Sequence, residues 1–441
     1  MRNLALALTL VASSASAQAS SSAETISLTP TAAVDTAIWV HPTDVRRSLI
    51  FGTDQIAGGL ASYFLDGGRA ELVNLGLTRA VDVRYGVKLD GRLTDVVLVV
   101  GVNGVFRLLA PDGDAGRLSP LDLAFTSSGS NANAAALSLN PADGTLMIYI
   151  SDFAGNVRHF TAVDDGQGHL AATLTRTVPL GSPVEGIAAD DRGQRLFITI
   201  ANRGLYALEA ASTGSTMPTL VDSIDAGRLA GAKGVALYFT ADGGGYVIAS
   251  ASQTSRFPVY SLGNGFPFVT SFNLVADAGG KGTTNSAGID VMPLSLGAPF
   301  DKGLFVAHDP NNFSGPNYKL VKWDAIALRT TPPLAVDPSF DPRTRAGPDA
   351  GSPDAGTKCP VTLDAGTRDG GTASDGGAGD AGADAGVVPC SGAGGGRGGS
   401  VGLPPIGSGG SGQEPASCGC TAAGALIPLA AVLLLLRRRR L

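Results

Sequence analysis

The chain has 441 residues, a formal net charge of −6, only 16% charged residues and 61 glycines. No basic stripe runs through its body, so the sequence gives no reason to expect a nucleic-acid partner. A charge-poor chain rich in glycine, valine, leucine and alanine is typical of a large antiparallel β protein.

The first residues have the pattern of a secretory signal peptide. Arg2 supplies a positive charge, residues 4–12 form an apolar core, and Ala15-Ser16-Ala17 is a small-residue cleavage site. The sequence therefore predicts a signal peptide over residues 1–17, a mature chain that begins near Gln18, and export from the cytoplasm. A buried N-terminal helix is the alternative.

From residue 34 to residue 323, short β runs alternate with clusters of glycine, proline and aspartate. The first runs lie at 37–40, 48–52 and 60–65, and the turn His41-Pro42-Thr43-Asp44 separates the first two. The pattern recurs in about six units of roughly 45 to 55 residues, each with three or four strands, as propeller blades require. We therefore expect an all-β fold, a six-bladed β-propeller over residues 18–342. A β-sandwich is the competing architecture, but it would not repeat one motif six times.

The C-terminal part changes character. Residues 343–417 are rich in Asp-Ala-Gly triplets, with too few apolar groups to order, and predict a disordered acidic tether. In residues 418–441, Cys418-Gly419-Cys420 precedes an apolar run at 421–436 and four arginines. This tail predicts a short hydrophobic helix of about 24 Å, the chain's one contact with a membrane. In an oxidising compartment Cys359 and Cys390 could pair.

The tail resembles the C-terminal sorting tag of myxobacterial surface proteins. The resemblance rests on the cysteine pair, the hydrophobic run and the terminal arginine block. It implies processing near Cys418 and Cys420 and retention at the cell surface. A plain single-span anchor is the alternative.

Six blocks of the β body resemble a known family. They are VDTAIWVHPTD, AVDVRYGVKLDG, EGIAADDRGQRLFI, GVALYFTADGGGYVIAS, GIDVMPLSLGAPFDKGLFVAHD and NYKLVKW. In this order and spacing they are similar to the β-propeller phytases, secreted calcium-dependent enzymes that remove phosphates from myo-inositol hexakisphosphate. The resemblance implies a phosphorylated small molecule such as phytate as partner, calcium as cofactor and a monomeric propeller.

The resemblance also implies roles for particular residues. Calcium ions held by carboxylates bridge the protein to the phosphates, and basic side chains hold phosphate oxygens. The implied calcium ligands are Asp35, Asp82, Glu185, Asp290 and Asp309. Asp35, Glu185 and Asp290 are the implied catalytic residues, and Arg84, Lys233 and His308 the implied substrate-binding residues. Each aspartate could instead cap its own turn.

Other positions depart from the family's pattern, and these are positions at which the family has calcium-binding or phosphate-binding residues. Acids of the family are replaced by Val34, Ile200, Ala201, Gly231, Lys233, Asn285 and Ala287. A lysine is missing at Gln55 and Ile56, an arginine at Gly104 and a tyrosine at Ala135. A cation such as Lys233 repels the metal whose ligand it replaces. The sequence therefore predicts a partly eroded site.

Three functions remain open at this point. The chain is a phytase-like phosphomonoesterase tethered at the cell surface, a catalytically inactive propeller that binds a ligand or partner there, or another propeller hydrolase such as a lactonase with one central calcium. The first and third require carboxylates clustered at the propeller mouth, whereas the second does not.

Overall fold

The computed structural model describes residues 16–27, 33–56, 58–122, 126–276 and 281–344. These residues belong to one compact unit. Most of the predicted signal peptide, almost all of the tether, the C-terminal hydrophobic helix and all four cysteines lie outside the described residues. Within the described part, no helix is long and apolar enough to cross a membrane.

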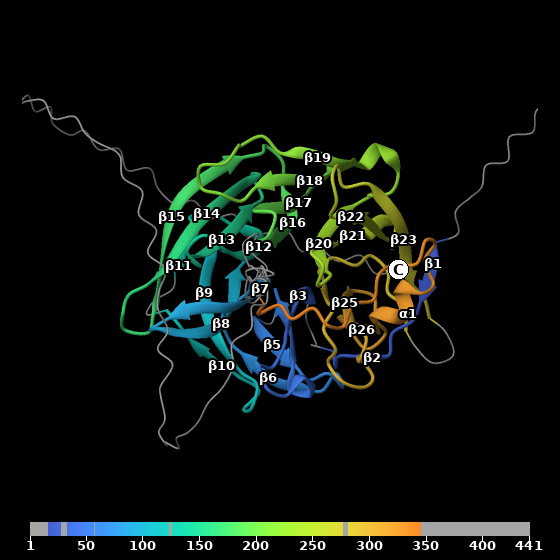
Figure 1. Ribbon diagram of the computed structural model, residues 1–441, viewed down its shortest axis with the longest axis horizontal. Coiled ribbons are helices and arrows are strands. Elements are labelled where there is room, and N and C mark those ends of the chain that lie inside the picture. The colour runs from blue at the N-terminus through green and yellow to red at the C-terminus, as the bar shows by residue number, and fades with distance from the viewer. Residues whose placement is uncertain (1–15, 28–32, 57, 123–125, 277–280, 345–441) are drawn as a thin grey trace, which may run out of the picture. The chain divides into compact units, whose positions relative to one another are not determined.

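In the described part of the chain, the strands form six sheets arranged in a ring (Figure 1). From inner to outer edge, the first blade is β3 (Ala33–Trp39), β4 (Leu49–Asp54), β5 (Gly59–Tyr63) and β6 (Arg69–Val73), and the second is β7 (Thr78–Leu89), β8 (Arg92–Gly101), β9 (Val105–Asp112) and β10 (Arg117–Pro120), with β11 (Thr126–Ser127) also on β9. The third blade is β12 (Ala132–Leu139), β13 (Leu146–Asp152), β14 (Asn156–Asp164) and β15 (Leu170–Pro179), and the fourth is β16 (Val184–Asp190), β17 (Arg195–Ile200), β18 (Gly204–Glu209) and β19 (Thr219–Ser223). The fifth blade is β20 (Ala232–Phe239), β21 (Gly245–Ala251), β22 (Phe257–Ser261) and β23 (Phe268–Leu274), and the sixth is β24 (Ile289–Met292), β25 (Leu304–Asp309) and β26 (Asn317–Lys322). The predicted all-β, six-bladed propeller is confirmed.

The N-terminal segment adds the outermost strand to the last two blades. Strand β2 (Ala23–Glu24) pairs antiparallel with β26, and β1 (Ala17–Ala19) pairs parallel with β23. The inner strands β3, β7, β12, β16, β20 and β24 each contact the next, and β24 returns to β3. The ring is therefore closed by chain segments about 300 residues apart in sequence.

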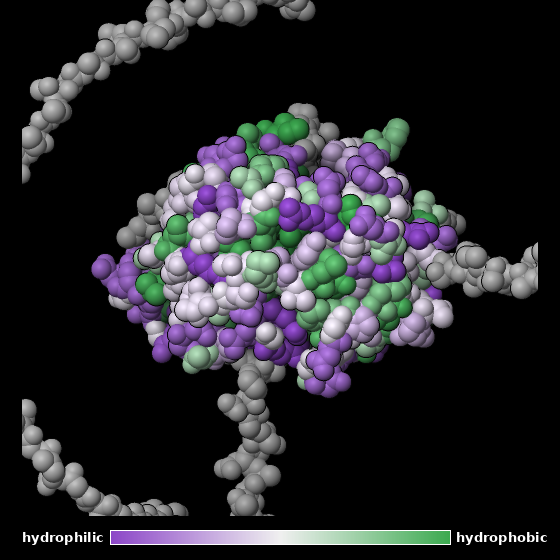
Figure 2. Space-filling model, turned by 90° about the horizontal axis from the view of Figure 1, so that it is seen from above, coloured by the Kyte–Doolittle hydropathy of each residue, from purple (hydrophilic) through white to green (hydrophobic). Residues whose placement is uncertain are grey.

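The middle strands explain why the blades stack. Every residue of β4 and of β13 is buried, because each sheet lies between two neighbours and buries both faces. The outer strand β15 is mostly exposed or half-buried. Large apolar side chains that remain exposed, such as Leu93 and Met217, are dispersed, and Figure 2 shows polar and apolar residues mixed over one face.

After β26 the chain forms a short helix, α1 (Trp323–Ala327), and then residues 335–344 cross the ring. Trp323, the last residue of the block NYKLVKW, begins this helix, stacks on Tyr238 and donates from Nε1 to the carbonyl of Ala335. At the other end of the crossing segment, Arg343 donates to the carbonyl of Val40 and to Asp95. The crossing segment thus ties the fifth and sixth blades to the first and second.

Candidate functional site: the axial mouth

A cavity of about 420 Å³ opens where the six inner strands begin. We call it the axial mouth. Every blade contributes to its lining, because each inner strand starts at the ring axis. Its charged and polar side chains are Asp35, Gln55, Arg79, Asn133, Glu185, Lys233, Asn285 and His308. Four of the residues predicted from the sequence, Asp35, Glu185, Lys233 and His308, therefore meet here.

Glu185 and Lys233 form an ion pair across the mouth. Lys233 Nζ lies 2.9 Å from Glu185 Oε2, and the pair joins the starts of β16 and β20. The Glu185 side chain is 13% exposed and that of Lys233 is 38% exposed. The predicted calcium ligand is thus already paired with the cation that replaces an acid of the family.

Arg79, which the sequence did not single out, is the second cation of the mouth. Its Nη1 donates to Gln55 Oε1 at 2.5 Å and its Nη2 to Asn133 Oδ1 at 2.6 Å. Asn133 Nδ2 donates in turn to the carbonyl of Val184, which fixes the direction of its oxygen. The one sequence feature that could have indicated Arg79 is its position as a cation just before an apolar run.

Asp35, which is half-buried, and His308, which is buried, have shifted pKa values. Burial raises the pKa of Asp35 to about 7, although N–H donation from Val81 opposes the shift. Burial lowers the pKa of His308 to about 4, so the imidazole is neutral at pH 7. His308 Nδ1 accepts from the backbone N–H of Ala287 at 3.4 Å. His308 therefore offers phosphate no positive charge.

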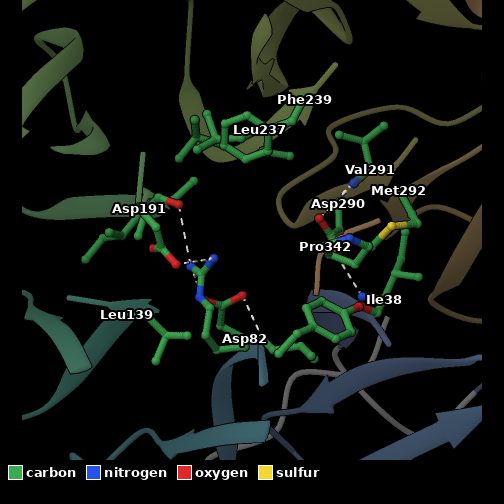
Figure 3. Close-up of a pocket in the computed structure, with 18 of the residues that line it drawn as sticks. Ile38, Asp82, Leu139, Asp191, Leu237, Phe239, Asp290, Val291, Met292 and Pro342 are labelled. Carbon is green, nitrogen blue, oxygen red and sulfur yellow. Dashed lines mark hydrogen bonds and ion pairs between the residues drawn. The ribbon is translucent and has the colours of Figure 1, made fainter. Parts of the chain in front are cut away.

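Asp82, Arg84 and Asp290 instead line a second cavity, of about 220 Å³, at the other ends of the inner strands. Figure 3 shows Asp82, Asp191 and Asp290 around it, with Leu237 and Phe239 on its wall. Arg84 Nη1 lies 3.6 Å from Asp191 and its Nη2 donates to the carbonyl of Leu137. The structure thus separates Arg84 from Lys233 and His308.

Three of the predicted acids connect neighbouring blades. Asp35 Oδ2 accepts the N–H of Val81 at 3.1 Å, Asp82 Oδ2 that of Leu137 at 2.6 Å, and Asp290 Oδ2 that of Ile38 at 2.7 Å. In each case the donor belongs to the inner strand of the next blade, where no sheet partner exists on that side. Burial raises the pKa of Asp290 to about 8 and also raises that of Asp82.

Asp309 lies apart from both cavities. Its Oδ2 is 3.2 Å from Lys319 Nζ, whose side chain is completely buried, and Lys319 also pairs with Glu24 of β2. Its Oδ1 accepts the N–H of Asn311. This carboxylate therefore takes part in closing the ring rather than in the mouth.

The described residues do not fit the calcium cluster that the resemblance implies. Among them, no group of three or more histidine, cysteine, aspartate or glutamate side chains is placed to hold a metal ion. Of the five implied ligands, Asp35 lines both cavities, Asp82 and Asp290 line only the second cavity, Glu185 lines only the mouth, and Asp309 belongs to the β25–β26 contact. Calcium usually takes six to eight oxygen ligands, so this arrangement provides too few at any one place.

Comparison with known proteins agrees with the resemblance of the sequence blocks. A solved structure, BBS1N in complex with ARL6DN and soaked with lead, is similar at a TM-score of 0.41 and 12% identity over 66% of this chain and 79% of that one, too weak to carry an argument. The 3-phytase of Bacillus subtilis (strain 168) is 28% identical over 309 residues, which are 67% of this chain and 80% of that protein. The family model described as Phytase matches residues 3–346. Since that match covers well over half of the sequence, the chain belongs to the phytase family.

Proposed function

We propose that the axial mouth binds phosphorylated small molecules of the phytate type and hydrolyses their phosphomonoesters slowly. One observation carries this proposal: Asp35, Glu185 and Lys233, which the family resemblance implies for catalysis and binding, line one cavity at the ring axis. The 3-phytase similarity supports a phosphate ester as the substrate class. The separation of the implied calcium ligands supports a reduced, partly eroded activity.

The chain's own residues suit two tasks at the mouth. Lys233 carries a positive charge that attracts phosphate oxygens, and Glu185 holds its ammonium group in place at 2.9 Å. Asp35 has a pKa of about 7, which suits a group that exchanges a proton with water or with a leaving oxygen near neutral pH. Together these three residues can position a phosphate ester and move a proton, but they do not replace a cluster of metal ions.

We expect phosphate release from phytate to stay low even with excess calcium. Glu185 is already neutralised by Lys233, so added calcium gains little from it. The measurement is free phosphate released by the full chain with calcium and with a chelator, with the Bacillus subtilis 3-phytase run in parallel. A calcium-dependent rate comparable to that enzyme's would overturn the proposed erosion.

The variant Lys233→Glu is expected to tighten calcium binding by about tenfold or more. It removes a cation beside Glu185 and adds a carboxylate, and two facing carboxylates attract a divalent ion. Calorimetric titration with calcium measures the change. The control is Lys302→Glu, the same charge reversal at an exposed position outside the mouth. Equal calcium affinity in Lys233→Glu and the unmodified chain would show that the Glu185–Lys233 ion pair is not what weakens calcium binding.

A second candidate is a catalytically inactive propeller that binds the same ligands. The Glu185–Lys233 ion pair favours it, since the pair leaves one predicted catalytic carboxylate engaged. Phosphate-ester binding without measurable phosphate release, at any calcium concentration, would select this candidate over a slow enzyme.

We further propose that the protein is exported and held at the cell surface through residues 418–441. The signal-like residues 1–17 and the sorting-tag-like tail support this. Protease shaving of intact cells is expected to release the propeller, and its retention inside the cells would contradict export.

A further inference from the structure

Arg79 is held in one orientation by groups from the two neighbouring blades. It starts on β7, while Gln55 follows β4 and Asn133 belongs to β12, and both amide oxygens accept from the guanidinium. The ring of Phe153 lies 5.5 Å from its central carbon. Two of its five N–H groups are thus used by neutral acceptors, and in the described part of the chain no carboxylate is hydrogen-bonded to the cation.

The charges of the mouth balance without a metal. Its charged lining residues are the two acids Asp35 and Glu185 and the two cations Arg79 and Lys233, which gives a formal net charge of zero. Lys233 is hydrogen-bonded to Glu185, whereas the hydrogen-bond partners of Arg79 are uncharged amides, and Glu185 and Asp35 act on Arg79 only through their charge at longer range. Arg79 is therefore the cation of this cavity that gains most from an incoming anion.

We propose that Arg79 is the phosphate anchor of the mouth, and that the mouth accepts a singly phosphorylated ester in preference to a polyphosphorylated one. This proposal rests on the proposed function and narrows it: phytate can enter the mouth through one of its phosphates, but its other phosphates add nothing to affinity. A planar guanidinium fixed in place suits one phosphate group, because it can donate two parallel hydrogen bonds to two of its oxygens.

The preference for a single phosphate follows from charge. Each phosphate ester carries up to about two negative charges near neutral pH. One such group is matched by Arg79 and Lys233, but every further phosphate meets Asp35, Glu185 and uncharged lining residues. Without metal ions to neutralise them, additional phosphates are repelled or remain in solvent, and they add nothing to affinity.

A purely structural Arg79 would behave differently. In that case the guanidinium only joins Gln55 and Asn133, and its loss changes stability but not the affinity for an anion. Ligand affinity and thermal unfolding must therefore be measured on the same variants.

The probe is phenylphosphonate, an analogue of a singly phosphorylated ester that cannot be hydrolysed, titrated calorimetrically into the full chain in the presence of a chelator. We expect binding, a loss of about tenfold or more in Arg79→Gln, and partial recovery in Arg79→Lys, which keeps the charge but not the fork. The matched control is Arg69→Gln, which removes one positive charge from the outer strand β6. Its affinity is expected to equal that of the unmodified chain. Should Arg79→Gln fail to fold, Gln55→Ala, which frees one side of the guanidinium, is expected to weaken binding severalfold.

Phytate is titrated under the same conditions and is expected to bind no more tightly than phenylphosphonate. Unchanged affinity in Arg79→Gln, or in Gln55→Ala if the former does not fold, would refute the anchor. Tighter binding of phytate than of phenylphosphonate in chelator would refute the ligand preference. The proposed function is tested separately by phosphate release. If phenylphosphonate binds through Arg79 but no phosphate ester is hydrolysed, the proposed enzymatic activity is refuted and the anchor stands. If Arg79→Gln hydrolyses phosphate esters as fast as the unmodified chain, the anchor is refuted and the activity stands.

Discussion

Replacing Lys319 with alanine is expected to lower the free energy of unfolding by about 3–5 kcal/mol. The Lys319 side chain is 0% exposed, and its ammonium group lies 3.2 Å from Asp309 Oδ2 and 3.0 Å from Asn312 Oδ1. It also pairs with Glu24 on β2, the strand that closes the ring. Alanine leaves the Asp309 carboxylate, itself 6% exposed, buried without its cation.

Urea unfolding of the full chain measures this effect, with the free energy extrapolated linearly to water. Lys322→Ala, on the same strand but only half-buried, is the control and is expected to change stability by about 0.5 kcal/mol or less. Glu24→Gln should cost less than Lys319→Ala, because Glu24 is 34% exposed and solvent screens its charge. A Lys319→Ala variant as stable as Lys322→Ala would show that the buried pair does not hold the ring closed.

A second variant separates the unpaired charge from the lost packing. In Lys319→Met combined with Asp309→Leu, both charges are removed and apolar groups fill the space. Replacement of a buried ion pair by apolar residues is often neutral or stabilising, so most of the loss in Lys319→Ala should be recovered. A double variant as unstable as Lys319→Ala would instead point to lost contacts of β2 with β26.

The fold could be predicted because middle strands such as β4 and β13 are buried on both faces. Runs such as residues 96–100 read as uninterrupted apolar segments between turns, and this repeats in each blade. The outer strands cannot be predicted in the same way, since β15 is mostly exposed and its apolar residues are interrupted by threonines and an arginine. Strands β1 and β2 are only three and two residues long, and their partners lie more than 250 residues away. No local pattern could reveal them.

The site could be predicted only in part, because the sequence shows on which strand a residue lies but not at which end of the ring axis its side chain emerges. Arg84 follows Arg79 by five residues on β7, about 16 Å along an extended strand, so it reaches the second cavity instead of the mouth. Family resemblance directed attention to Arg84 and passed over Arg79. The backbone contacts of Asp35, Asp82 and Asp290 were likewise invisible, because their N–H partners lie on the neighbouring blade.

Stability is expected to fall by about 1–2 kcal/mol between pH 6.5 and pH 8 in the presence of a chelator. Burial raises the pKa of Asp290 to about 8 and that of Asp35 to about 7, whereas both ionise near pH 4 in the unfolded chain. Above pH 4 the folded state therefore binds more protons than the unfolded state, and raising the pH favours unfolding until these carboxyls have ionised. The stability contributed by the two protonated groups is complete at low pH and lost as the pH rises through about 7 and 8.

The window starts at pH 6.5 because buried histidines act in the opposite direction below it. Burial lowers the pKa of His159 to about 3 and that of His308 to about 4, so the unfolded chain takes up protons that the folded chain does not, down to those values. Below pH 6.5 the histidines offset most of the effect of Asp35 and Asp290, and the remaining fall comes from Asp191, whose pKa burial raises to about 6. Asp35 and Asp290 also face water-accessible cavities, and solvent reduces the size of the fall in stability.

Urea unfolding across this pH range tests the sign of the change. Asp290→Asn, whose amide cannot ionise, should flatten the fall in stability, while Asp301→Asn at an exposed site should leave it intact. If the stability of the unmodified chain stays level or rises from pH 6.5 to 8, Asp290 is already ionised at neutral pH. It would then join the two blades as a charged carboxylate and not as a protonated carboxyl group.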